Sequence, residues 1–127
     1  MTDRFFAMGA VSAALAVLLG SFGAHALKVR LAPEQLAVFE TGVRYHLIHA
    51  LGLLAAAWAA GRYGDGPATW GGWLLLAGTV LFSGSLYALS LSGVRWLGMI
   101  TPFGGVAFIV GWVLLAMAAW RGPVSGT

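Results

Sequence analysis

Two charged residues and two histidines stand close together in a chain that is otherwise very apolar. These four residues, within ten positions of the sequence, are Glu40, Arg44, His46 and His49. An arginine can hold a lipid phosphate or a carboxylate through paired hydrogen bonds, and an imidazole can bind a metal, carry protons or bond to another helix. The types of residue therefore indicate three kinds of chemistry: anion binding, metal or proton handling, and structural pairing.

The spacing of Glu40 and Arg44 predicts an ion pair. The two residues are four positions apart with the acid first, which is the favourable order on a helix. A single charge near hydrocarbon is costly, and pairing with an opposite charge is the usual remedy. We therefore expect a structural clamp at the membrane boundary. The alternative is an Arg44 side chain that holds an anion such as a lipid phosphate.

His46 and His49 are three positions apart, so they share one face of a helix, about opposite Glu40 and Arg44. Two imidazoles on one face could chelate a metal with His25 as a third ligand, and a haem would need His25 as an axial ligand. The interpretation that we favour is hydrogen bonding between helices or a position at the headgroup level. The sequence therefore predicts no metal, no cofactor and no catalytic residue.

The composition indicates that this segment belongs to an integral membrane protein. Of the 127 residues, 60% are hydrophobic and only 9% are charged, and the mean hydropathy is +0.88. A soluble domain carries about a quarter charged residues. The net charge of +3 comes from basic residues scattered at the ends of apolar runs, so we expect no nucleic-acid binding. The absence of cysteine excludes disulfides and thiolate sites.

Long runs without charge predict four membrane-spanning helices. A helix needs about 20 apolar residues to cross the hydrocarbon layer, and it satisfies the backbone groups that lipid leaves without partners. The fold class that we expect is all-α, a four-transmembrane-helix bundle that forms one domain over residues 1–127. Its spans cover about residues 5–27, 43–61, 70–92 and 98–120.

The segment between the first two spans predicts a separate short amphipathic helix on the membrane surface. Pro33 suits a first helical position and Glu34 suits a first turn, and apolar residues follow at helical spacing. Gly42 is a possible bend into the second span. Thr101 and Pro102 predict the cap and the first residue of the fourth helix, after a short interfacial lead-in.

The first span has an alternative interpretation as a secretory signal peptide. Ala24-His25-Ala26 fits a small-x-small cleavage site. The length of the apolar run, with Lys28 and Arg30 directly after it, favours a helix that is retained. Lysine and arginine divide almost evenly between the two sides of the membrane, so the orientation stays open.

All four helices bring polar residues to one end of the expected bundle, the end opposite the two termini. Small residues recur every four positions in each helix, which predicts close packing of the helices. No nucleophile elbow, metalloprotease motif or phosphate loop is present, so we expect no enzyme. The candidate residues of this polar end are His25, Glu40, Arg44, Tyr45, His46, His49, Tyr87 and Thr101.

These features favour a non-enzymatic accessory, scaffold or lipid-binding protein. We expect it in the lipid bilayer, with a homo-oligomer or a larger membrane complex as possible assemblies. The alternative is a small-molecule, metal or proton-handling site at the polar end. An oligomeric channel or exporter ranks last, because no span carries a continuous polar stripe.

Three stretches together resemble one known family. They are Gly20-Ser-Phe-Gly-Ala-His-Ala-Leu-Lys28, then Phe39-Glu-Thr-Gly-Val-Arg-Tyr-His46 with His49-Ala-Leu-Gly52, then Gly84-Ser-Leu-Tyr87 followed by Gly98-Met-Ile-Thr-Pro-Phe-Gly-Gly105. The sequence is similar to the bacterial and mitochondrial membrane proteins described as domain of unknown function 423, also called the transmembrane protein 256 family. The resemblance spans nearly the whole chain. It implies a four-span protein of the plasma or bacterial inner membrane and implies no activity. The motifs of the family match His25, Glu40, Arg44, His49, Tyr87 and Thr101.

Overall fold

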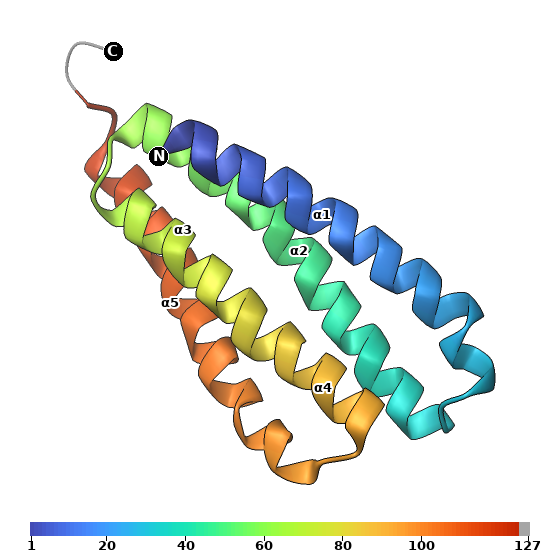
Figure 1. The fold of residues 1–127 in the computed structure, drawn as a ribbon. Coiled ribbons are helices and arrows are strands. Elements are labelled where there is room, and N and C mark those ends of the chain that lie inside the picture. Colours follow the sequence, from blue (N-terminus) through green and yellow to red (C-terminus); the bar gives the residue numbers. More distant parts are fainter. Residues whose placement is uncertain (125–127) are drawn as a thin grey trace.

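The computed structural model describes residues 1–124 as helices with short connections. Four antiparallel rods lie along one another, and α5 finishes at the end of the bundle where α1 begins (Figure 1). The third rod consists of three consecutive elements, α3, η2 and α4. In chain order the elements are α1 (Thr2–His25), η1 (Leu27–Val29), α2 (Pro33–Tyr63), α3 (Pro67–Gly78), η2 (Thr79–Ser83), α4 (Gly84–Ser92), η3 (Arg95–Met99) and α5 (Thr101–Arg121).

Three of the rods are long and apolar enough to cross a membrane. These segments are Thr2–Val29, Pro67–Ser92 and Arg95–Arg121. The remaining rod, α2, has 31 residues and is therefore about 46 Å long, which exceeds the hydrocarbon thickness of about 30 Å. It contains more charged residues than any one of the other three rods. The all-helical class predicted from the sequence is confirmed, and α2 packs against each of the other rods.

The separate surface helix is wrong, because α2 is one continuous helix that passes through Gly42. Gly42 is buried, and the ring of Tyr87 would lie 2.9 Å from a Cβ at this position. The Gly42 carbonyl oxygen accepts a hydrogen bond of 2.7 Å from the Ser83 hydroxyl. The glycine therefore serves a close contact between rods. Because α2 begins at Pro33, residues 40–49 lie well inside a long helix and not at its start.

The third rod contains a π-helical turn, η2, in the middle of its length. Thr79 and Ser83 mark the two ends of this turn, and both are buried. Their hydroxyls donate to the carbonyl oxygens of Leu75, at 2.9 Å, and of Gly42, at 2.7 Å. Single π turns inside α-helices are often found at functional sites.

Glycines bring α5 very close to the third rod. A Cβ on Gly104 would lie 2.7 Å from the backbone Cα of Phe82, and a Cβ on Gly78 would meet the Phe108 ring at 2.5 Å. Further along the same interface, a Cβ on Gly71 would lie 2.9 Å from the carbonyl oxygen of Gly111. The expected packing through small residues is confirmed for this pair of rods.

The start of α5 agrees with the sequence only in part. A short 3₁₀ turn, η3, leads into a helix that begins at Thr101 with Pro102 in its first turn. The capping role expected for Thr101 is wrong, because no side chain caps this helix. The Thr101 hydroxyl instead bonds to the Ser85 hydroxyl at 2.6 Å, so it ties α5 to α4.

α1 packs mainly against α2, on the side away from α5 (Figure 1). Phe5 near its start also reaches the third rod, where its ring meets Trp73 edge-on at a centroid distance of 5.3 Å. Gly9 and Gly23 bring α1 close to α2, with Ala50 and Phe39 as their neighbours. Among residues 1–124, α2 is therefore the main support of α1.

Candidate functional site

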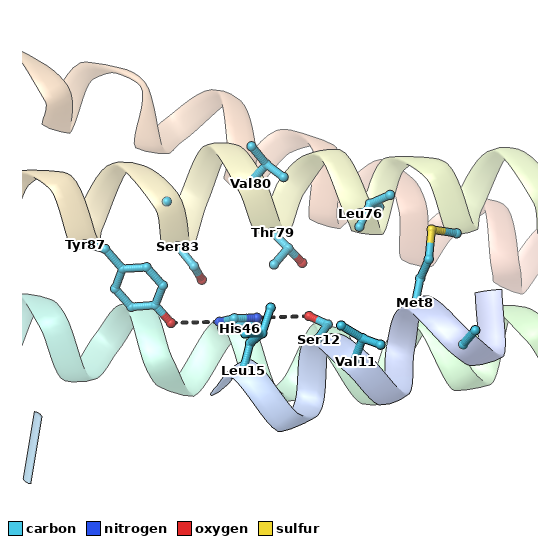
Figure 2. Close-up of a pocket in the computed structure, with 12 residues that line it drawn as sticks. Met8, Val11, Ser12, Leu15, His46, Leu76, Thr79, Val80, Ser83 and Tyr87 are labelled. Carbon is cyan, nitrogen blue, oxygen red and sulfur yellow. Dashed lines mark hydrogen bonds between the residues drawn. The ribbon is translucent and has the colours of Figure 1, made fainter. Parts of the chain in front are cut away.

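A lateral groove with a volume of about 590 Å³ lies between α1 and the third rod, and α2 forms its floor (Figure 2). Apolar side chains form its walls, and a few polar side chains reach it from three rods. The apolar residues are Ala7, Met8, Val11, Leu15, Leu76 and Val80, and the polar residues are Ser12, His46, Thr79, Ser83 and Tyr87.

His46 is the centre of a hydrogen-bonded chain of three side chains, which we call the His46 chain. Its Nδ1 atom lies 2.8 Å from the Tyr87 hydroxyl oxygen, and its Nε2 atom lies 2.9 Å from the Ser12 hydroxyl oxygen. Figure 2 shows the imidazole between these two hydroxyls. Only 7% of the His46 surface is exposed, so this one residue of α2 links α1 to α4 from inside the bundle.

The His46 chain lies about half-way along the rods and not at one end. Ser12 is near the middle of α1, and the groove residues Thr79 and Ser83 lie at the middle of the third rod. The structure places His46 and His49 away from the expected polar end, and both bond to other helices, which is the first of the two positions favoured from the sequence. The physical reason is that α2 begins at Pro33, so residues expected at the start of a span lie deep within a helix. Hydrocarbon surrounds a spanning bundle at this depth.

His49 lies three residues further along α2, but it faces α5. Its Nδ1–H donates to the Tyr45 carbonyl oxygen at 2.7 Å, and its Nε2 accepts the indole N–H of Trp112 at 3.1 Å. Its ring stacks on Phe108 with a centroid distance of 3.4 Å and an interplanar angle of 10°. Both partners together fix one neutral tautomer, with the proton on Nδ1.

The three histidines do not converge. His46 and His49 share one face of α2, as expected from their spacing, and both are buried, but their ring nitrogens bond to different rods. His25 is exposed at the end of α1. Within residues 1–124 no group of three histidine or acidic side chains could hold a metal. The structure therefore does not assemble the set on which the metal and haem alternatives depend.

Glu40 and Arg44 lie on the exposed outer face of α2, away from the groove. In the part of the chain that the structure describes, no ion pair joins them, so the expected clamp is not formed. Both side chains are exposed and lie one helical turn apart.

The structure separates the remaining candidates of the expected polar end. Tyr87 belongs to the His46 chain, whereas the ring of Tyr45 packs on Phe82 with a centroid distance of 4.6 Å. Thr101 bonds to Ser85 between α4 and α5. Of the eight candidates, only His46 and Tyr87 line the lateral groove.

Three hydroxyl residues of the groove, Ser12, Thr79 and Ser83, escaped the sequence analysis. Ser12 stands in a row of small residues along α1, with Ala16, Gly20 and Ala24, a pattern that predicts helix packing. Thr79 and Ser83 stand in an apolar run with no charged neighbour. The signal that could have found them is a hydroxyl at the centre of a span, where lipid offers no hydrogen-bond partner.

Long apolar helices around buried polar groups at half depth define a polytopic helical membrane protein. The chain belongs to the protein family of unknown function DUF423, whose model matches residues 19–105.

Relatives from several bacteria support this assignment. The chain is 52% identical over 116 residues to the UPF0382 membrane protein YwdK of Bacillus subtilis. The matched region covers 91% of this chain and 94% of the relative. It is 46% identical over 117 residues to a UPF0382 membrane protein of Staphylococcus epidermidis, a match that covers 92% of this chain and 95% of the relative. It is 41% identical over 122 residues to the UPF0382 inner membrane protein YgdD of Escherichia coli, with 95% and 93% covered.

No solved structure matches the chain. The relatives identify a protein of the plasma or inner membrane with several helical spans, embedded in the lipid bilayer. The family and the location predicted from the sequence are confirmed.

Proposed function

We propose that this protein is a non-enzymatic lipid-binding protein that holds one hydrocarbon chain of a lipid in the lateral groove. The observation that carries the proposal is the groove itself, with its volume of about 590 Å³ and its largely apolar walls. The groove opens between two rods that are long and apolar enough to span the bilayer. A lipid chain in the bilayer therefore meets it directly, without passing through water.

The energetics of such a site favour selection by shape. Lipid chains are as apolar as the groove walls, so moving a chain from the bilayer into the groove gains no hydrophobic free energy. Binding depends instead on close contact with the walls and on any hydrogen bond that the ligand completes. The polar floor around His46 is the part of the groove that can favour one lipid over another.

The residues of the groove support binding and not catalysis. The side chains that line it carry no carboxylate, lysine or arginine. His46 has both ring nitrogens in hydrogen bonds to hydroxyls, and the Ser83 hydroxyl donates to the Gly42 carbonyl. In a Ser-His-Asp triad a carboxylate orients the base and stabilises its charged form, and the residues that line the groove supply no carboxylate.

Filling the groove tests the proposal. Gly84 lines the groove, and a Cβ at this position would meet nothing within 4 Å, so Gly84→Phe places a ring there without a clash at the backbone. We expect wild-type protein, purified in mild detergent, to retain one lipid molecule per protein, because the groove shields the hydrocarbon chain of the lipid from the detergent. The Gly84→Phe variant should lose it. Native mass spectrometry and lipid extraction measure the amount that remains.

Gly61→Phe is the matched control. Gly61 is an exposed residue of α2, outside the groove, and a Cβ there would make only ordinary contact with the Thr2 side chain at 3.6 Å. This variant should retain as much lipid as the wild type. Equal retention by the wild type and both variants would show that the lipid binds elsewhere.

A further inference from the structure

The His46 chain has one proton more than its own hydrogen bonds use. A neutral imidazole carries one N–H, and Tyr87 and Ser12 carry one O–H each. Two hydrogen bonds connect the three groups, of 2.8 Å to Tyr87 and 2.9 Å to Ser12. Each bond uses one proton, so one of the three protons has no acceptor within the chain of groups.

The position of this extra proton follows from the tautomer of His46. With the ring proton on Nδ1, the imidazole donates to Tyr87 and accepts from Ser12, so the Tyr87 proton is left over. With the ring proton on Nε2, the imidazole accepts from Tyr87 and donates to Ser12, so the Ser12 proton is left over. In both cases the spare donor is a hydroxyl at one end of the His46 chain.

Both hydroxyls that can hold the spare proton line the lateral groove (Figure 2). Apart from His46, neither has a hydrogen-bond partner among residues 1–124. A hydroxyl donor without an acceptor is costly where hydrocarbon replaces water. An acceptor atom brought by the occupant of the groove removes this cost.

We propose that the groove selects an uncharged lipid with a carbonyl oxygen within its apolar body, and that this oxygen accepts the spare proton of Ser12 or Tyr87. The inference rests on the lipid-binding function proposed above. A ketone or quinone oxygen only accepts, so it matches one spare donor. An alcohol brings a further donor that needs its own acceptor, and a carboxylate or phosphate brings a charge that is costly at this depth.

The depth of the His46 chain separates this class from ordinary glycerolipids. The ester carbonyls of a glycerolipid lie near the headgroups, about 15 Å from the centre of the bilayer. Ser12 lies near the middle of α1, far from either end of the rod. A carbonyl at that depth belongs to the apolar part of its carrier, as in a long-chain ketone or a quinone with a hydrocarbon tail.

Two probes of equal chain length test the inference on the wild-type protein. One is heptadecanone with carbon-13 at its carbonyl, and the other is heptadecane. Native mass spectrometry in detergent measures the binding of each, and infrared spectroscopy records the labelled carbonyl band. We expect the ketone to bind about tenfold more tightly than the alkane, as one added hydrogen bond allows, with its band shifted to lower frequency.

Two variants show whether the shift arises at the groove. The Ser12→Ala, His46→Leu, Tyr87→Phe combination removes all three donors, and we expect it to bind both probes equally with no shifted band. The Gly84→Phe variant keeps the donors and fills the groove, so it should lose both probes and the shifted band. The second variant and the wild-type comparison remain decisive if the triple variant does not fold.

The possible results separate the two proposals. If the wild type binds ketone and alkane equally and the carbonyl band is not shifted, the groove binds lipid without selecting an acceptor, and the inference is wrong. If the wild type retains neither probe nor any lipid, the proposed lipid-binding function is wrong as well.

Discussion

His46 and His49 are close neighbours on α2 and nearly equally buried, with 7% and 4% of their surfaces exposed. Each uses both ring nitrogens in hydrogen bonds. Around His49, two donors meet two acceptors: its own N–H reaches the Tyr45 carbonyl, and the Trp112 N–H reaches its Nε2. Around His46, three donors share two bonds. The first set is complete, and the second can accept a ligand.

The contacts that the third rod makes with α5 and with α1 also differ. On the side of His49, α5 meets the third rod through glycines at distances that leave no room for a Cβ. On the side of His46, α1 leaves a groove toward the third rod. Burial and residue type are the same for the two histidines, so neither property separates a structural histidine from one at a binding site. The number of donors against acceptors does separate them, whereas free volume does not, because a second cavity of about 490 Å³ lies beside His49.

The largest expected effect compares one glycine from each side. In Gly104→Ala the new Cβ would press on the backbone of Phe82, which cannot move aside as a side chain can. We expect a loss of about 3 kcal/mol in the free energy of unfolding. In Gly84→Ala the Cβ enters open space, and the higher helix propensity of alanine should stabilise the protein by about 1 kcal/mol. Thermal unfolding in detergent measures both changes.

A similar loss for both alanines would mean that the groove side is as tightly packed as the α5 side. The contrast between the two faces of α2 would then disappear, and with it the argument for a groove that a lipid can enter.

A smaller effect is expected when one hydrogen bond is removed from the complete set around His49. His49→Leu leaves the Trp112 N–H without its acceptor and should lower the free energy of unfolding by about 1–2 kcal/mol. Trp112→Phe added to this variant removes the donor, so the double variant should lose less than the sum of the two single losses. The measurement is a double-mutant cycle of unfolding free energies in one detergent. Strict additivity would show that the bond from Trp112 to His49 contributes nothing.

The smallest effect is a change of tautomer without a change of stability. Nitrogen-15 chemical shifts of the histidine rings should show His49 with its proton on Nδ1, with or without a bound ketone. The Tyr45 carbonyl accepts that proton and the Trp112 N–H donates to Nε2, so together they fix this tautomer. The His46 shifts should change when heptadecanone binds, because an acceptor at Ser12 favours the Nε2–H form and an acceptor at Tyr87 favours the Nδ1–H form. Unchanged His46 shifts in the presence of bound ketone would contradict the link between ligand and tautomer.

Much of the architecture could be predicted from the sequence. Charge-free runs located the rods, because the length of a spanning helix depends on the thickness of the bilayer. Rows of small residues indicated close packing, and the glycines of α5 and the third rod show it. Helical spacing placed His46 and His49 on one face of α2, opposite Glu40 and Arg44, and the structure shows that this face is buried.

The depth and the partners of the candidate site could not be predicted in the same way. Charge marked Glu40 as the edge of a span, although α2 continues past it toward Pro33. His46 was visible as a polar residue, but its partner Ser12 is 34 positions away and becomes its neighbour only when α1 packs on α2. The choice of α1 for one histidine and α5 for the other depends on the packing of whole rods, which local spacing does not record.

The π turn of the third rod has a consequence for helical phase. A π turn holds one residue more than the α-helix that it replaces, and one residue of an α-helix corresponds to a rotation of about 100° and a rise of about 1.5 Å. Loss of a single residue between Thr79 and Ser83 would therefore leave a regular helix of nearly the same phase, with Tyr87 still directed at His46 and Ser85 at Thr101. A residue lost after the π turn and before Ser85 would instead rotate both side chains by about 100° about the rod axis, away from these partners. The π turn thus marks a segment where the third rod can change its length by one residue and keep the alignment of α4 with both of its neighbours.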